Sequence, residues 1–243
     1  MAESSYLPEV RVLVTGFGVS IALRSFWSRW LTPTYQPFLD IKSNPSWTIA
    51  SRLPTTLTHR GVSIRIITPD SPLKAEYHHL LETAPKLIEQ HAPDAVIHIG
   101  LAVERSYFAV ERGAQRDGYS LYPDMAGKTI TKAQAKKLFA KSPDRLDSKV
   151  DFDALLRSWK GNLPKPTAKG KGEVTDVRLS DDVGNYVCGL VYYASLEKMW
   201  RDGNEDTKVL FFHLPPLAGP ADLERGEAAT LALIKAVAEQ CEK

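Results

Sequence analysis

The chain has few cysteines, no long apolar run and almost no net charge, and each absence excludes a class of protein. Its two cysteines, Cys188 and Cys241, cannot form the dense disulfide framework of small secreted domains. No segment approaches the roughly 20 apolar residues of a membrane-spanning helix. The first ten residues, MAESSYLPEV, lack the apolar centre of a signal peptide. We therefore expect a cytoplasmic protein with no membrane partner.

The chain also has little net charge and lacks two common metal-binding spacings. A formal net charge of +2 gives no reason to expect a nucleic-acid partner. The spacings Cys-x-x-Cys and His-Glu-x-x-His are absent. The adjacent pair His78 and His79 would diverge by about 100° on a helix, so a shared metal ion is not expected there. We expect no metal and no cofactor.

What is present predicts an α/β fold. A length of 243 residues with 43% hydrophobic residues suits one domain with a sizeable core. Apolar, β-branched runs alternate with segments of helical periodicity, which predicts a three-layer αβα sandwich around a largely parallel or mixed sheet. The predicted strands are residues 10–17, 62–68, 95–101, 107–111, 174–179 and 209–213.

The helices are predicted from their start signals and apolar faces. Asn44 and Ser71, each followed by proline, are expected to cap two of them, and Pro85 to kink or divide the second. A third helix carries Cys188 and a fourth ends near Cys241, which we expect to be a packing residue. Residues 160–173, rich in Lys, Pro and Gly, are predicted to be a flexible surface loop within the single domain 1–243.

Cys188 and His213 are the candidate chemical pair. Cys188 precedes an apolar helical run, and His213 ends a predicted strand 25 residues later. Only a thiolate attacks, and an imidazolium or a helix N-terminus lowers the pKa of a thiol. Taken singly, the cysteine is more often a small core residue and the histidine a core residue bonded to a carbonyl.

The residues around this pair favour a chemical role over a packing role. The segment 180–196, SDDVGNYVCGLVYYASL, resembles the nucleophile segment of the pyroglutamyl peptidase I family, and 211–217, FFHLPPL, resembles its histidine segment. HIGLAVERSYFAVE, residues 98–111, is similar to the family block that carries an acidic residue. VLVTGF, residues 12–17, followed by Pro37, Phe38 and NPSW at 44–47, resembles the family's opening. The four blocks occur in the family's order.

The resemblance implies a cysteine exopeptidase with a Cys188, His213 and Glu111 triad. Glu111 would orient the imidazole, and Glu104 is a rival acid that fits the block's spacing less well. Asp181 or Asp182 is expected to cap the nucleophile helix, whose dipole would favour a thiolate. Backbone N–H groups near Cys188 would stabilise the oxyanion.

The resemblance also implies the substrate. An N-terminal pyroglutamyl residue is a neutral lactam without a free amine, and an apolar slot lined by aromatic rings suits its faces. Phe17 and Phe38 match the family's two phenylalanines and are the expected substrate-binding residues. Pyroglutamyl peptides are the expected partners, and a homo-oligomer is left open.

Residues 19–36, VSIALRSFWSRWLTPTYQ, interrupt the opening motif. Their removal would join Gly18 to Pro37 and restore the family pattern. The segment is 18 residues long, begins with Val19-Ser20, which can encode a splice donor, and ends with Tyr35-Gln36, which can encode a splice acceptor. We therefore predict a retained or misannotated intron, with a genuine inserted loop as the alternative.

Three functions remain open. The intact Cys188, His213 and Glu111 favour an active peptidase. The interrupted opening motif favours a catalytically impaired homologue that binds a ligand or peptide without turnover. A different hydrolase or a nucleoside-cleaving enzyme on a similar sandwich is the third reading, and it leaves the cysteine motif unexplained.

Overall fold

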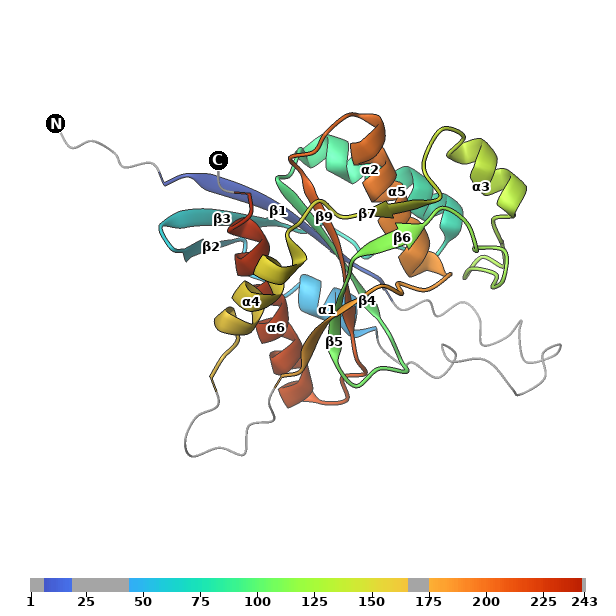
Figure 1. Cartoon of the computed structure of the whole chain (residues 1–243). Helices are drawn as coiled ribbons and strands as arrows, with labels where there is room; N and C mark the ends of the chain where they lie inside the picture. Colours follow the sequence, from blue (N-terminus) through green and yellow to red (C-terminus); the bar gives the residue numbers. More distant parts are fainter. Residues whose placement is uncertain (1–6, 19–43, 166–174, 242–243) are drawn as a thin grey trace.

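A seven-stranded sheet forms the centre of the protein. The structure, a computed structural model, describes residues 7–18, 44–165 and 175–241. The strand order is β2-β3-β1-β4-β9-β5-β8 (Figure 1). The strands are β1 (Glu9–Gly16), β2 (Thr56–His59), β3 (Val62–Ile67), β4 (Ala95–Leu101), β5 (Phe108–Glu111), β8 (Val177–Ser180) and β9 (Lys208–Leu214). A separate two-stranded sheet pairs β6 (Gly113–Gln115) with β7 (Arg145–Asp147).

The large sheet is mixed and mostly parallel. Strands β3, β1, β4 and β9 pair in parallel, as do β5 and β8, whereas β2 is antiparallel to β3 and β5 is antiparallel to β9. Every residue of β4 is buried, which explains why its sequence is a continuous apolar run rather than an alternating one. The predicted α/β class is confirmed.

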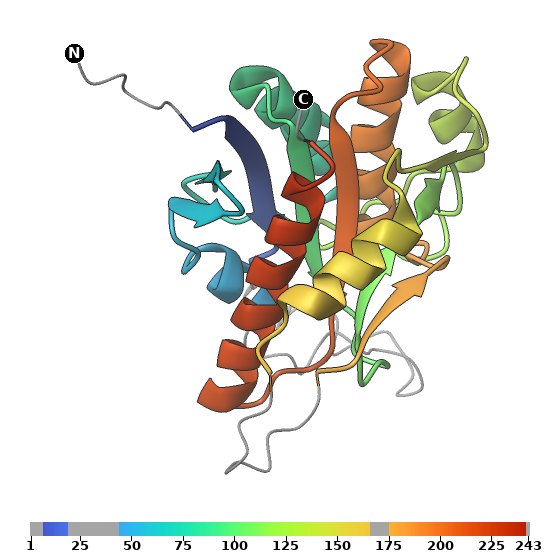
Figure 2. The same cartoon turned by 60° about the vertical axis from the view of Figure 1, so that its left-hand side comes forward.

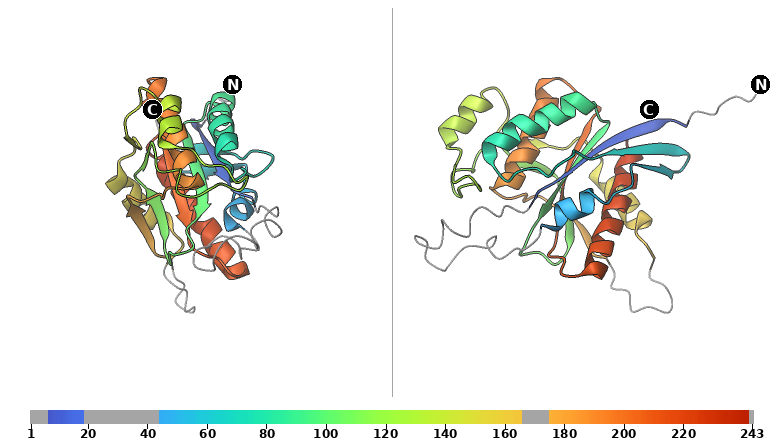
Figure 3. Two further views of the ribbon diagram at one scale, coloured as in Figure 1. Left: turned by 90° about the vertical axis from the view of Figure 1, so that its right-hand side faces the viewer. Right: turned by 180° about the vertical axis from the view of Figure 1, so that it is seen from behind.

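Helices cover both faces of this sheet (Figures 1 and 2). The helices are α1 (Pro45–Ala50), α2 (Tyr77–His91), α3 (Lys132–Leu138), α4 (Phe152–Asn162), α5 (Val187–Arg201) and α6 (Pro220–Ala238). Helices α1, α4 and α6 lie on one face, while α2 and α5 lie on the other (Figure 3). Alternate residues of β9 enter the two cores: Phe212 packs with α4 and α6, and Phe211 packs with α2 and α5.

The predicted start of α2 needs correction, and one of the two effects expected of Pro85 does not occur. Helix α2 begins at Tyr77 rather than at Ser71, because Leu73 forms a bridge with Phe17 and its N–H donates to the Gly16 carbonyl at 2.9 Å. Pro85 does not divide α2, which runs unbroken to His91. A buried face that includes residues on both sides of the proline holds the helix together although one backbone hydrogen bond is lost.

Other predicted boundaries shift or fall outside the described chain. Residues 160–162 of the predicted loop 160–173 form the last turn of α4, and residues 166–174 lie outside the described residues. Cys241 follows the end of α6 and packs against the core beside Asp94, whose carbonyl lies 3.6 Å from its sulfur. The segment 19–36 and Phe38 also lie outside the described residues.

Candidate active site

Cys188 lies in the first turn of α5, on the face of the sheet that α2 and α5 cover. It is the second residue of the helix and is partly exposed, while its neighbours Val187 and Gly189 are buried. The apolar run that follows packs against the sheet and fixes the start of α5 over the ends of the central strands. The residue therefore keeps some contact with solvent, although its sulfur lies against the sheet.

Gly100 makes room for the sulfur. A Cβ atom on this glycine of β4 would lie 3.1 Å from the Cys188 Sγ and 2.6 Å from the Cζ atom of Phe211. Contacts this short leave no space for any larger side chain. The sulfur therefore lies directly over β4 at Gly100, which is the position paired with His213 on β9.

His213 and Glu111 form a short hydrogen bond. The Nδ1 atom of His213 lies 2.7 Å from Glu111 Oε1, and both side chains are buried. Glu111 is the last residue of β5 and pairs with Phe211 across the antiparallel strands. The carboxylate thus fixes one imidazole nitrogen and leaves Nε2 to face another group.

The strand order places the imidazole between the thiol and the carboxylate. Strand β9, which carries His213, lies between β4, which lies under Cys188, and β5, which carries Glu111. Within the described parts of the chain, the structure shows no hydrogen bond between the Cys188 sulfur and His213. The sequence-predicted trio is therefore brought to one face of the sheet, with the acid and the base in direct contact.

Burial and hydrogen bonding act in opposite directions on Glu111. Burial opposes its ionisation, but the hydrogen bond and charge of His213, together with bonds from Ser180 and Arg105, hold its pKa below the ordinary value. Glu111 is therefore a carboxylate at neutral pH.

The thiol differs from the sequence-based expectation. Burial, followed by the negative charges of Glu111 and Glu104, raises the pKa of Cys188 to about 12, although the charge of Arg105 and the backbone N–H lower it. The helix start alone therefore does not produce a resting thiolate. Desolvation outweighs the helix dipole because the sulfur lies against the sheet, with protein atoms in place of water.

The expected aspartate cap of α5 is also wrong. The helix begins one residue after Tyr186, and no acidic residue lies in its first turn. Asp182 instead accepts a hydrogen bond from the Gly184 N–H at 3.0 Å, which shapes the loop 181–186. No carboxylate from this loop therefore caps the helix start beside Cys188.

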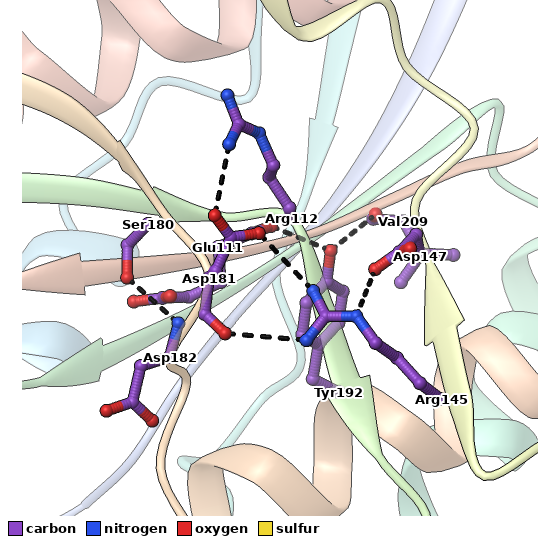
Figure 4. Close-up of polar contacts among 9 residues, drawn as sticks. All are labelled: Glu111, Arg112, Arg145, Asp147, Ser180, Asp181, Asp182, Tyr192 and Val209. Carbon is purple, nitrogen blue, oxygen red and sulfur yellow. Dashed lines mark hydrogen bonds and ion pairs between the residues drawn. The ribbon is translucent and has the colours of Figure 1, made fainter.

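Two partly exposed arginines hold the outer side of the loop 181–186. Arg112 lies 3.1 Å and Arg145 lies 3.5 Å from the carboxylate of Asp181 (Figure 4). Arg145 also pairs with Asp147 of β7 at 2.8 Å. These surface pairs tie the loop to the small sheet, each with a modest stabilising energy.

Arg105 holds the inner side of the same loop. Its Nη1 donates to Glu111 Oε1 at 2.6 Å, and its Nη2 donates to the Asp182 carbonyl at 2.6 Å. The resemblance matched this arginine to one in the family's acidic block and left open whether it is structural. Gly100 was missed, although an isolated glycine inside an apolar strand is a known sign of close approach.

The structure places the remaining predicted residues in different surroundings. Glu104 lies exposed in the turn before β5, away from the His213 hydrogen bond, which Glu111 occupies. Phe17 follows β1, is only 3% exposed, and belongs to the same apolar cluster that Cys188 packs against. Its N–H donates to Ser46 Oγ at 2.9 Å, which fixes the chain at this edge of the sheet. Phe38 lies outside the described residues.

The described residues show neither a metal centre nor a membrane span. In the described ranges, no three His, Cys, Asp or Glu side chains are grouped so that they could hold a metal ion. No helix within those same ranges combines the length and apolar character needed to cross a bilayer.

Comparisons with known proteins agree on one family. The family model described as pyroglutamyl peptidase matches residues 29–239. Pyroglutamyl-peptidase 1 of Rattus norvegicus is 25% identical over 238 residues, which is 97% of this chain and 94% of the relative. The pyrrolidone-carboxylate peptidase of Thermococcus onnurineus is 28% identical over 203 residues, which is 83% of this chain and 91% of the relative.

Solved structures of pyrrolidone carboxyl peptidases have a similar fold. A mutant pyrrolidone carboxyl peptidase from the hyperthermophile Pyrococcus furiosus superposes with a TM-score of 0.69 at 21% identity, over 96% of this chain and all of that one. At this identity the likeness establishes the fold. The family match covers most of the chain, including Cys188, Glu111 and His213. The chain therefore belongs to the pyroglutamyl peptidase family.

Proposed function

We propose that this protein is a cysteine exopeptidase that removes an N-terminal pyroglutamyl residue from peptides. The observation that carries this proposal is the placement of His213 between the sulfur of Cys188, over β4, and the carboxylate of Glu111, on β5. A base between a nucleophile and an orienting acid is the arrangement that acyl transfer requires.

The proposed reaction starts from a neutral thiol. Because the pKa of Cys188 is raised to about 12, the sulfur loses its proton to His213 Nε2 as the substrate binds, and Glu111 stabilises the imidazolium that forms. This step requires the sulfur and the imidazole to come into hydrogen-bond contact. Catalytic hydrogen bonds commonly tighten only in the complex with substrate.

The sulfur then attacks the pyroglutamyl carbonyl carbon. The new C–S bond gives a tetrahedral oxyanion, for which the backbone N–H groups of the first turn of α5 are the proposed donors. Collapse of this intermediate breaks the C–N bond, and the imidazolium of His213 gives its proton to the leaving amine. Water, deprotonated by His213, next hydrolyses the thioester, which releases pyroglutamate and restores the thiol of Cys188.

The substrate slot is proposed at the carboxyl edge of β1 and β4. Phe17 lies at this edge, in the apolar cluster that adjoins Cys188. Its ring, together with that of Phe38, would pack on the faces of the neutral lactam. Ligands of open α/β sheets bind at this edge of the strands, which supports the placement.

A second candidate is a non-catalytic homologue that binds the same ligand. The 18-residue segment 19–36 separates Phe17 from Phe38 in the sequence and favours this reading. The raised pKa of the Cys188 thiol also favours it, because a resting thiol is a weak nucleophile.

Hydrolysis of a fluorogenic pyroglutamyl amide under reducing conditions tests the proposal. We expect turnover by the unmodified protein, loss of at least about 1,000-fold in Cys188→Ala, and nearly full activity in Cys241→Ser. A thiol alkylator should inactivate both the unmodified protein and Cys241→Ser. Equal rates for the unmodified protein and Cys188→Ala would contradict a cysteine peptidase. Binding of the pyroglutamyl amide without turnover would support the second candidate.

A further inference from the structure

One oxygen of Glu111 accepts hydrogen bonds from two cationic partners. Glu111 Oε1 lies 2.7 Å from His213 Nδ1 and 2.6 Å from Arg105 Nη1. The Arg105 side chain is 11% exposed and that of Glu111 is fully buried. An arginine at this depth stays charged, so it provides a permanent positive charge beside a group that burial would otherwise neutralise.

The other end of the Arg105 guanidinium holds the chain that leads to the nucleophile. Its Nη2 donates to the carbonyl of Asp182, and residues 181–186 connect β8 directly to α5. The planar guanidinium therefore links the acid of the site to the backbone six residues before Cys188. Lysine could not make both contacts with the same rigidity.

We propose that Arg105 is a positioning residue that keeps Glu111 in its charged form and fixes the loop 181–186 so that Cys188 and His213 keep their relative placement. The inference rests on the proposed function for its catalytic meaning. The contacts themselves do not depend on that function. Among the described residues, the hydrogen bonds of the Arg105 side chain go to Glu111 and Asp182, and none goes to Cys188 or Phe17.

Several charged and titratable groups face Glu111. They come from four elements besides its own strand: His213 from β9, Arg105 from the turn between β4 and β5, Cys188 and Tyr192 from α5, and the Ser180 hydroxyl from β8. The Tyr192 hydroxyl donates to the Glu111 backbone carbonyl at 2.9 Å, so it does not supply charge to the carboxylate (Figure 4). Glu104 adds a negative charge that Arg105 offsets.

Loss of the Arg105 guanidinium should therefore raise the pKa of both Glu111 and Cys188. Removing a neighbouring positive charge raises the pKa of a carboxyl group, so Glu111 would become protonated at a higher pH. The positive charge of Arg105 also lowers the pKa of Cys188, so the thiolate would form at a higher pH without it. A residue with a purely structural role would reduce activity without changing either ionisation.

The test measures the second-order rate constant for alkylation of Cys188 by iodoacetamide at pH 8, in the Cys241→Ser background so that only Cys188 reacts. Because pH 8 lies well below the pKa of this thiol, the thiolate fraction falls about tenfold for each unit that the pKa rises, and we expect Arg105→Gln to slow alkylation by about 10-fold or more. Arg105→Lys, which keeps the charge, should stay close to the unmodified rate. If the glutamine variant does not fold, a folded Arg105→Lys that is alkylated about 10-fold more slowly would overturn the proposal.

Arg112→Ala is the matched control. Arg112 also holds the loop 181–186, through the exposed carboxylate of Asp181, but it makes no side-chain contact with Glu111 among the described residues. We expect its alkylation rate at pH 8 to be unchanged. Equal losses of rate in Arg112→Ala and Arg105→Gln, or no loss in either, would overturn the assignment of Arg105.

The same variants separate this inference from the proposed function. The acid limb of pyroglutamyl amide hydrolysis should move upward in Arg105→Gln and stay in place in Arg112→Ala. If the unmodified protein hydrolyses no pyroglutamyl amide while alkylation is slowed in Arg105→Gln alone, the peptidase function fails and the role of Arg105 stands. If hydrolysis is normal and neither the alkylation rate nor the acid limb changes in Arg105→Gln, the peptidase function stands and the role of Arg105 fails.

Discussion

Gly100 and Cys188 meet where a helix start crosses a central strand, and an added Cβ atom on the glycine would lie 3.1 Å from the sulfur. The same atom would lie 2.6 Å from the ring of Phe211, which is fully buried. This glycine therefore sets the depth at which the sulfur lies above the sheet, next to His213 on the paired strand.

Gly100→Ala should disturb both stability and activity. We expect the free energy of unfolding to fall by about 1–3 kcal/mol, as overpacking in a core usually costs. Pyroglutamyl amide hydrolysis should fall by more than the unfolded fraction explains, since the sulfur is displaced. Gly161→Ala in α4 is the control, because an added Cβ meets no atom within 4 Å there. Unchanged stability and rate in Gly100→Ala would contradict the placement of the sulfur.

Glu111→Gln should lower kcat while the protein stays folded. The amide can keep one hydrogen bond to His213 but cannot stabilise an imidazolium by charge. We expect a loss of about 100-fold to 10,000-fold, smaller than that of Cys188→Ala. Glu104→Gln is the matched control and should retain most activity, because Glu104 lies exposed in a turn. A rate in Glu111→Gln equal to that of the control would show that Glu111 has no catalytic role.

Substrate choice should depend on the neutral lactam. We expect cleavage of a pyroglutamyl amide and no detectable cleavage of the glutaminyl or glutamyl amide with a free ammonium. A charge brought into the apolar cluster that contains Phe17 would lose its hydration without a partner. Steady-state rates on the three amides decide this. Comparable rates on the glutaminyl and pyroglutamyl amides would rule out the apolar slot.

His98 should make the protein sensitive to acid. It is 1% exposed on β4, its ring nitrogens contact Thr15 Oγ1 at 2.7 Å and Ser195 Oγ at 2.8 Å, and burial lowers its pKa to about 3. The unfolded chain takes up this proton near pH 6.5, whereas the folded chain does not. Stability from this group is therefore complete above pH 6.5 and is lost as the pH falls towards 3.

Urea unfolding between pH 7 and pH 4 measures this effect. We expect the unmodified protein to lose up to about 1.4 kcal/mol per pH unit from this group alone. His98→Gln should be less stable at pH 7 but have a flatter dependence on pH. The exposed His78 provides the control, and His78→Gln should follow the unmodified protein. A slope in His98→Gln as steep as in the unmodified protein would assign the acid sensitivity to other groups.

Removal of residues 19–36 should leave a folded and more active protein. The Phe17 N–H bonds to Ser46 Oγ at 2.9 Å, so the chain before and after this region is held together by contacts that the deletion keeps. A loop whose ends are adjacent can change length at small entropic cost. We expect higher solubility and faster pyroglutamyl amide hydrolysis without the apolar segment, which holds Phe26, Trp27 and Trp30.

Two outcomes would contradict this expectation. A full-length protein at least as active as the deletion variant would show that the segment does not impair the site. A mature transcript that retains these 18 codons as its main form would contradict the retained-intron hypothesis.

The sequence determined the fold class, the family and the identity of the candidate trio. Continuous apolar runs identified the buried strands, because a parallel strand covered on both faces needs apolar residues at every position. Local motifs singled out Cys188, His213 and Glu111, because the chemistry of a nucleophile, a base and an acid depends on residue type. The structure joins the last two at 2.7 Å.

Only the tertiary structure decided how these residues affect one another. The position of the Cys188 sulfur over Gly100 depends on how α5 packs on the sheet. The hydrogen bonds of Arg105 to Glu111 and Asp182 depend on segments that lie far apart in the sequence. The pKa of the Cys188 thiol also depends on the tertiary structure. The helix start predicted a lowered pKa, whereas burial against the sheet raises it to about 12. Local patterns specify periodicity and residue type, whereas desolvation and cross-strand contacts exist only once distant segments pack together.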